Sequence, residues 1–176
     1  MSRVTEIRYV GYGVPDLEAE RAFYRDVWGL REVGEQGDMW HYAAPGSDEL
    51  YVVRLRQADE RRVDVIAMAV HRPSDVDMLH DKVAAAGCRI IFAPRALTTM
   101  GGGYGFRFFG KDGLTFEISA GVERGEKREM ARWDAVPQKI SHIVMHSPDH
   151  KGAVEFFVDV LGFKVSDWLG DFMAFL

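Results

Sequence analysis

The 176-residue sequence is 47% hydrophobic and 12% aromatic, enough to fill one domain of ~100 to 150 residues and part of another. Its formal net charge of -5 argues against a nucleic-acid or anionic-membrane partner, because both favour clustered lysines and arginines. The single cysteine, Cys88, excludes an internal disulfide, the N-terminus has no apolar signal core, and no apolar run approaches the ~20 residues of a membrane span. A cytoplasmic location is therefore expected.

The first elements form a strand, a helix and three more strands. Residues 7–14 alternate with a period of two, which predicts a strand with one face on a core. A helix should begin after the N-cap Asp16 and end at Gly29. Its apolar residues recur at helical spacing and are expected to face the core: Ala19, Ala22, Phe23 and Val27. Short strands are predicted at 31–35, 39–43 and 50–56.

The next stretch has the same order of elements. A strand is predicted at 63–70, followed by a helix from the N-cap Ser74 to Gly87. Three strands should follow, at 88–93, 104–109 and 114–119. The charged run 122–132 mixes both signs and is interpreted as a solvated linker.

A third stretch repeats the first. Residues 140–162 align without a gap with residues 7–29, and seven of the 23 positions are identical. This predicts a strand at 140–146 with His142 on one face, a helix from Asp149 to Gly162, and strands at 163–168 and 171–176. The module is one strand short, so its apolar helix stripe and Phe172 are expected to pack against another chain or residues outside this sequence.

The order βαβββ, with Pro-Asp before the helix and Gly-Leu or Gly-Phe after it, resembles the vicinal oxygen chelate superfamily of glyoxalase I, bleomycin-resistance proteins and type I extradiol dioxygenases. The resemblance implies an α+β fold in which two modules form a cup. It predicts a complete N-terminal cup-shaped domain at 1–121, built from modules 5–57 and 61–120. A linker at 122–138 and an incomplete third module at 139–176, the start of a C-terminal catalytic domain, should follow.

In this superfamily the metal ligands occupy cup-facing positions of the first and last strands of a module. His142 matches the first ligand, whereas the equivalent first-strand positions of the earlier modules hold Tyr9 and Val65. Their last-strand positions hold Arg54 and Glu117. These four are interpreted as vestigial cup positions, since one carboxylate does not make a metal site.

Arg54 and Glu117 hold equivalent positions on strands that should face each other. We therefore expect an ion pair in which the guanidinium stands roughly where a metal would otherwise balance the carboxylate. The alternative is that the two never meet and both reach solvent.

Among the members of the superfamily, the sequence looks most like an extradiol dioxygenase that cleaves catechol-type rings. That activity uses Fe(II), or sometimes Mn(II), held by two histidines and one carboxylate, with a small aromatic diol and O2 as substrates. Apart from His142, the ligands and catalytic residues would fall after Leu176, so this chain alone is predicted to be inactive and to bind no cofactor. A homo-oligomer is expected, without nucleic-acid or membrane partners.

Two other classes of function remain open. One is a metal-free protein that binds a small ligand in the N-terminal cup, as bleomycin-resistance proteins do, with Tyr9, Trp40 and Tyr42 lining the cup or packing its core. The other is a different metalloenzyme of the superfamily, an isomerase, epimerase or lyase.

Overall fold

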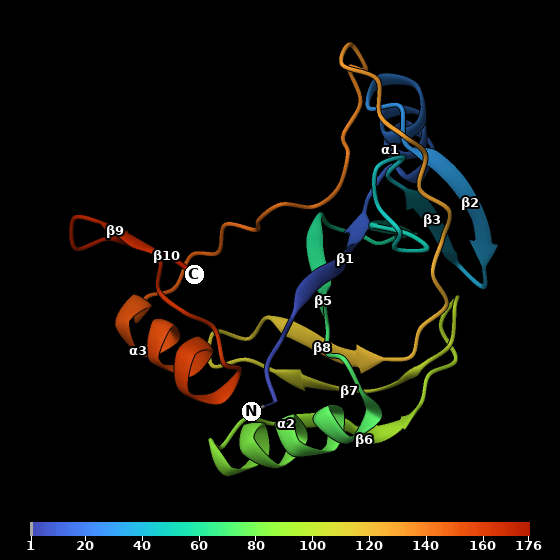
Figure 1. The fold of residues 1–176 in the computed structure, drawn as a ribbon. Coiled ribbons are helices and arrows are strands. Elements are labelled where there is room, and N and C mark those ends of the chain that lie inside the picture. Colours follow the sequence, from blue (N-terminus) through green and yellow to red (C-terminus); the bar gives the residue numbers. More distant parts are fainter. Residues whose placement is uncertain (1) are drawn as a thin grey trace.

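The computed structural model describes residues 2–176 and has a mixed α+β architecture, as predicted (Figure 1). The first module consists of β1 (Glu6–Val14), α1 (Leu17–Ala22), a π-helical segment η1 (Phe23–Val27), β2 (Arg31–Gln36), β3 (Met39–Ala43) and β4 (Val53–Gln57). The predicted Asp16 cap is confirmed, since its carboxylate accepts a hydrogen bond from the Ala19 amide at 3.0 Å.

The second module repeats this order. It consists of β5 (Arg62–Ala69), α2 (Pro73–Ala85), β6 (Ile90–Ala96), β7 (Tyr104–Phe109) and β8 (Thr115–Ala120). The predicted Ser74 cap is wrong: the helix begins at Pro73, whose ring presets the backbone of a first helical residue, and Arg72 stands at the cap without a side-chain hydrogen bond.

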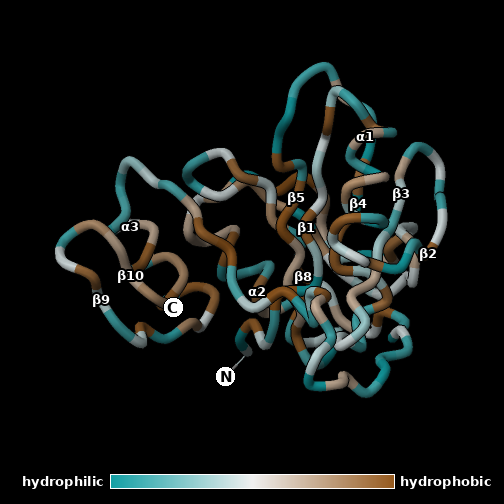
Figure 2. Tube along the Cα trace, turned by 90° about the horizontal axis from the view of Figure 1, so that it is seen from above, coloured by the Kyte–Doolittle hydropathy of each residue, from teal (hydrophilic) through white to brown (hydrophobic). Residues whose placement is uncertain are grey.

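The eight strands of both modules form one sheet in the order β2-β3-β4-β1-β5-β8-β7-β6. The first strand of each module runs parallel to its last strand, and the two modules meet at the antiparallel pair β1 and β5. Figure 2 shows hydrophobic segments at the centre of this sheet, around β5 and β8. One face of the sheet is covered by the helices, and the opposite face is here called the cup face.

The third module contains α3 (His150–Glu155), a second π-helical segment η2 (Phe156–Val160), β9 (Asp167–Leu169) and β10 (Met173–Phe175). The strand predicted at 140–146 is wrong, because within the described part of the chain this stretch has no sheet partner. Its equivalent, β1, pairs with the last strand of its own module and the first strand of the next. No residues equivalent to those two strands are present among residues 2–176.

The apolar stripes of the repeated helices meet different surroundings. Phe156, Phe157 and Leu161 are buried in one core with α2, β7 and β8, so the expectation that this stripe needs another chain is wrong. In the first module, by contrast, Phe23 and Val27 are exposed although their spacing predicts a core-facing stripe.

No helix among residues 2–176 is both long enough and apolar enough to cross a bilayer.

Candidate functional site

Two neighbouring rows of side chains cross the cup face, each contributed by adjacent strands. One row runs through Arg107, Glu117, Ala67 and Tyr9. The next runs through Val65, Gly11, Arg54 and His41. All four vestigial cup positions, Tyr9, Arg54, Val65 and Glu117, therefore lie on this face.

Glu117 is the buried anion of the first row, with a relative exposure of 1%. Its Oε1 accepts a hydrogen bond from the Tyr9 hydroxyl at 3.1 Å, and its Oε2 accepts one from Arg107 Nε at 2.7 Å. Burial and the nearby Glu117 charge raise the pKa of Tyr9 well above its ordinary value, so the phenol stays protonated and remains a donor. The carboxylate is thus neutralised by a neighbour in its own row.

The expected ion pair between Arg54 and Glu117 is wrong, because the partner of Glu117 is Arg107. Arg54 is only 6% exposed, and across residues 2–176 no carboxylate lies within ion-pair distance of it and its Nη1 has no hydrogen-bond acceptor. Its guanidinium carbon lies 5.2 Å from the Tyr9 ring centroid, within reach of a cation–π interaction. A Cβ at Gly11 would stand 3.2 Å from Arg54 Nε, so the glycine makes room for this side chain.

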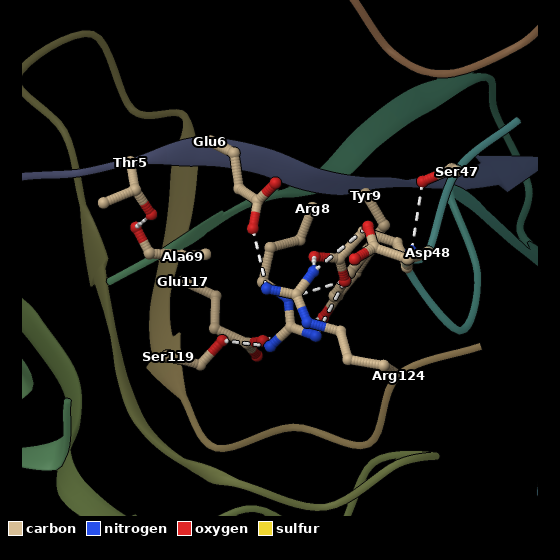
Figure 3. A network of polar contacts seen from close by, with 11 residues as sticks. Thr5, Glu6, Arg8, Tyr9, Ser47, Asp48, Ala69, Glu117, Ser119 and Arg124 are labelled. Atoms are coloured by element: carbon tan, nitrogen blue, oxygen red, sulfur yellow. Dashed lines mark hydrogen bonds and ion pairs between the residues drawn. The ribbon is translucent and has the colours of Figure 1, made fainter. Parts of the chain in front are cut away.

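A second charged network, not predicted from the sequence, lies beside the first row (Figure 3). Arg8 donates from Nε and Nη2 to Glu49 Oε2 at 3.0 and 2.8 Å, and from Nη1 to Ser119 Oγ at 3.1 Å. Arg124, from the predicted linker, pairs with Glu49 and also with Glu6. The network therefore ties β1, the loop before β4 and the linker together at one end of the cup face.

A β-bulge explains why alternation did not reveal Arg8. Tyr9 and Arg8 are consecutive, so strict alternation sends them to opposite faces, yet they reach Glu117 and Ser119, which lie two residues apart on β8. The β1/β5 register shifts between Ile7 and Tyr9, and such a shift re-aims the side chains next to it.

His41, on β3, is buried in the second row. Its ring stands edge-on to Tyr51 with the centroids 4.5 Å apart, and its Nδ1 lies 3.4 Å from the Gly34 carbonyl oxygen. Burial lowers the pKa of His41 to about 4, and the nearby Arg54 charge acts in the same direction. The imidazole is therefore neutral in the folded protein near neutral pH.

The burial of His41 predicts a contribution to the free energy of unfolding that is lost in mild acid. The unfolded chain protonates His41 near its ordinary pKa of 6.5, whereas the folded chain does so only near 4, so the contribution is present above pH 6.5 and falls as the pH drops to 4. The loss should approach about 3 kcal/mol. Urea unfolding of the wild type and of His41→Gln across this range should show a difference that shrinks with falling pH. The exposed His71→Gln should leave the pH dependence unchanged, and an equal slope for wild type and His41→Gln would contradict the prediction.

The donors present do not fit a metal on the cup face. The Glu117 carboxylate is already held by Tyr9 and Arg107, and the Arg54 cation stands in the neighbouring row. Nowhere in residues 2–176 do three or more histidine, cysteine, aspartate or glutamate side chains gather closely enough to hold a metal ion. His142 is exposed, and its Nδ1 lies 2.9 Å from Ser141 Oγ, which leaves Nε2 as its possible ligand atom. Its role as a ligand therefore stays a prediction.

Several known proteins are similar to this chain. A manganese-dependent 2,3-dihydroxybiphenyl 1,2-dioxygenase of Geobacillus genomosp. 3 is 26% identical over 179 residues, covering 96% of this chain and 56% of the relative. A Mn(II)-bound glyoxalase structure from Novosphingobium aromaticivorans is 63% identical, with a TM-score of 0.98 over 99% of this chain and 58% of that one. Homoprotocatechuate 2,3-dioxygenase from Arthrobacter globiformis is 25% identical, with a TM-score of 0.83 over 98% of this chain and 55% of that one.

The chain thus spans little more than half the length of these relatives. Residues 6–118 match the model of the Glyoxalase/Bleomycin resistance protein/Dioxygenase superfamily, which is more than half of the chain. The match covers the two βαβββ modules that meet at β1 and β5 up to the last residues of β8. The chain belongs to this superfamily.

Proposed function

We propose that this chain is the first half of a divalent-metal-dependent extradiol dioxygenase that cleaves a small aromatic diol with O2. In this proposal residues 1–121 are a metal-free N-terminal domain, 122–138 a linker and 139–176 the start of the catalytic domain. The observation that carries it is the contrast at one aligned position of the three modules, which holds Tyr9 in the first, Val65 in the second and His142 in the third. The two dioxygenases described above, at 25 and 26% identity, support the reaction class.

The N-terminal domain has a structural role in this proposal. Its equivalent of the metal site holds a buried carboxylate already satisfied by a tyrosine and an arginine. Extradiol cleavage uses a metal held by two histidines and a carboxylate, which brings the diol and O2 together. His142 supplies one histidine, and the other two ligands must come from residues outside this chain.

The test uses the full-length protein. Loaded anaerobically with Fe(II) or Mn(II) and then mixed with 2,3-dihydroxybiphenyl, catechol or homoprotocatechuate in air-saturated buffer, it should consume one O2 per diol and produce a yellow ring-fission product. Oxygen electrode traces and visible spectra record both events. A metal-loaded protein that consumes no O2 with any of these diols would overturn the proposal.

A metal-dependent isomerase of the glyoxalase type is the second candidate. It is favoured by the 63% identical structure, which is described as a Mn(II)-bound glyoxalase. Isomerisation consumes no O2, so turnover of an α-ketoaldehyde–thiol adduct under argon would support this candidate against ring cleavage. The metal-free binding function gains no support from the cup face, where Tyr9, Tyr51 and Val65 are buried against one another.

A further inference from the structure

The first module leaves an apolar surface at the end of its helix uncovered. Phe23, Val27 and Trp28 are 40%, 70% and 43% exposed, and the rings of Phe23 and Trp28 lie 5.7 Å apart. Val27 precedes Trp28 in the chain and lies four residues after Phe23, about one helical turn. Contiguous exposed apolar side chains are a feature of interaction surfaces. This group is called the helix-1 patch below.

The third module shows what covers the equivalent group. In the gapless alignment, Phe156, Val160 and Leu161 correspond to the three residues of the helix-1 patch. Phe156 is 6% exposed and Leu161 fully buried, and both belong to the core of the second module, with Val160 packed against it. The rings of Phe156 and Phe108 lie 6.2 Å apart. The same helix face is thus covered by the second module in the third module and is exposed in the first module.

Two reciprocal contacts relate the first and third modules by a two-fold rotation. A Cβ at Gly162, the end of the third-module helix, would stand 2.7 Å from Arg3 Cβ. A Cβ at Gly29, the end of the first-module helix, would stand 2.8 Å from Val136 Cγ1. Gly29 aligns with Gly162, and Arg3 and Val136 each lie four residues before the first aligned isoleucine. Each helix end therefore touches the segment that precedes the other repeat, as a two-fold relation requires and a translation does not.

A two-fold rotation that places the third module on the first also places the second module on a fourth. The observed contact between the third and second modules therefore corresponds to a contact between the first and fourth modules. We propose that the helix-1 patch docks on the helix-covered face of the fourth module of the full-length protein. This inference rests on the proposed function, which supplies that module. A second copy of this chain does not offer the same face, because its own η2 already covers it.

The test is cysteine labelling of the full-length protein in a Cys88→Ser background. Val27→Cys is the probe, and Glu18→Cys is the matched control, because Glu18 is on the same helix with its side chain 80% exposed. Each maleimide labelling rate is compared with the rate in urea. Docking predicts that Val27→Cys reacts at least ~100-fold slower in the native protein while Glu18→Cys slows by less than ~3-fold.

Equal reactivity of the two cysteines in the native protein would overturn the docking proposal, since an uncovered Val27 is largely exposed. Protection that disappears on dilution to the monomer would also overturn it, because the occupant would then be a second copy. Labelling needs neither metal nor substrate. Protection without ring cleavage would therefore reject the proposed reaction while supporting the docking, and ring cleavage without protection would do the reverse.

Discussion

Arg107→Met is expected to lower the free energy of unfolding by about 3 to 5 kcal/mol, because it leaves the buried Glu117 carboxylate without its cation. Within the described residues the Tyr9 hydroxyl would then be the sole remaining partner of that carboxylate. Methionine keeps much of the length of the arginine side chain, so the lost charge dominates the change. Urea unfolding followed by circular dichroism at pH 7 measures the effect.

Arg54→Met is the matched control for this substitution. Arg54 lies on the same face and is more deeply buried than Arg107, whose side chain is 21% exposed, but Arg54 has no carboxylate within ion-pair distance among residues 2–176. Replacing a buried charge that lacks a partner by an apolar side chain should leave the free energy of unfolding unchanged or raise it. A loss as large as that of Arg107→Met would contradict the assignment of Arg107 as the partner of Glu117.

His142→Ala is expected to abolish metal retention in the full-length protein and to lower kcat by at least ~100-fold, because under the proposed function it removes one of three protein ligands. Metal content after gel filtration, measured by atomic emission, gives a readout independent of turnover. The free energy of unfolding of the metal-free protein should change little, since the His142 side chain is exposed.

His146→Ala is the control for His142→Ala, because both histidines are exposed in the same stretch that precedes α3. Four residues of extended chain separate them by roughly 13 Å, too far to share one metal. His146→Ala should therefore keep its metal. Full metal content in His142→Ala, or equal losses in both variants, would contradict the assignment of His142.

Much of the fold was predictable because the sequence pattern repeats. Period-two alternation located the strands of the first two modules, and the limits of β3 and β7 agree with those predicted. The position of each strand within its module also placed Tyr9, Arg54, Val65 and Glu117 on one face.

The partners on that face were not predictable, because they depend on strand register. Arg54 and Glu117 hold the same position in the last strands of their modules, which suggested that they face each other. The observed strand pairing instead puts Arg54 in the row of His41 and Glu117 in the row of Arg107. The bulge in β1, which brings Arg8 to the side of Tyr9, leaves no mark in the alternation.

Helix periodicity likewise identified apolar stripes without showing what covers them. The stripe of the third module is buried against the second module, whereas part of the stripe of the first is exposed. The strand predicted at 140–146 failed for a related reason: strand propensity needs a pairing partner, and residues 2–176 provide none for this stretch.

The two π-helical segments bear on the history of the chain. η1 and η2 occupy aligned positions in the first and third modules, whereas α2 is α-helical throughout Pro73–Ala85. A π turn accommodates one extra residue in a helix and is rare. A single insertion inherited by both modules therefore explains the two π turns more simply than two separate insertions at the same position. The shared turn indicates that the first and third modules descend from a more recent common ancestor than the first and second. That order of descent agrees with the proposed function, in which a unit of two modules was duplicated whole and its two copies now differ at the aligned position of Tyr9 and His142.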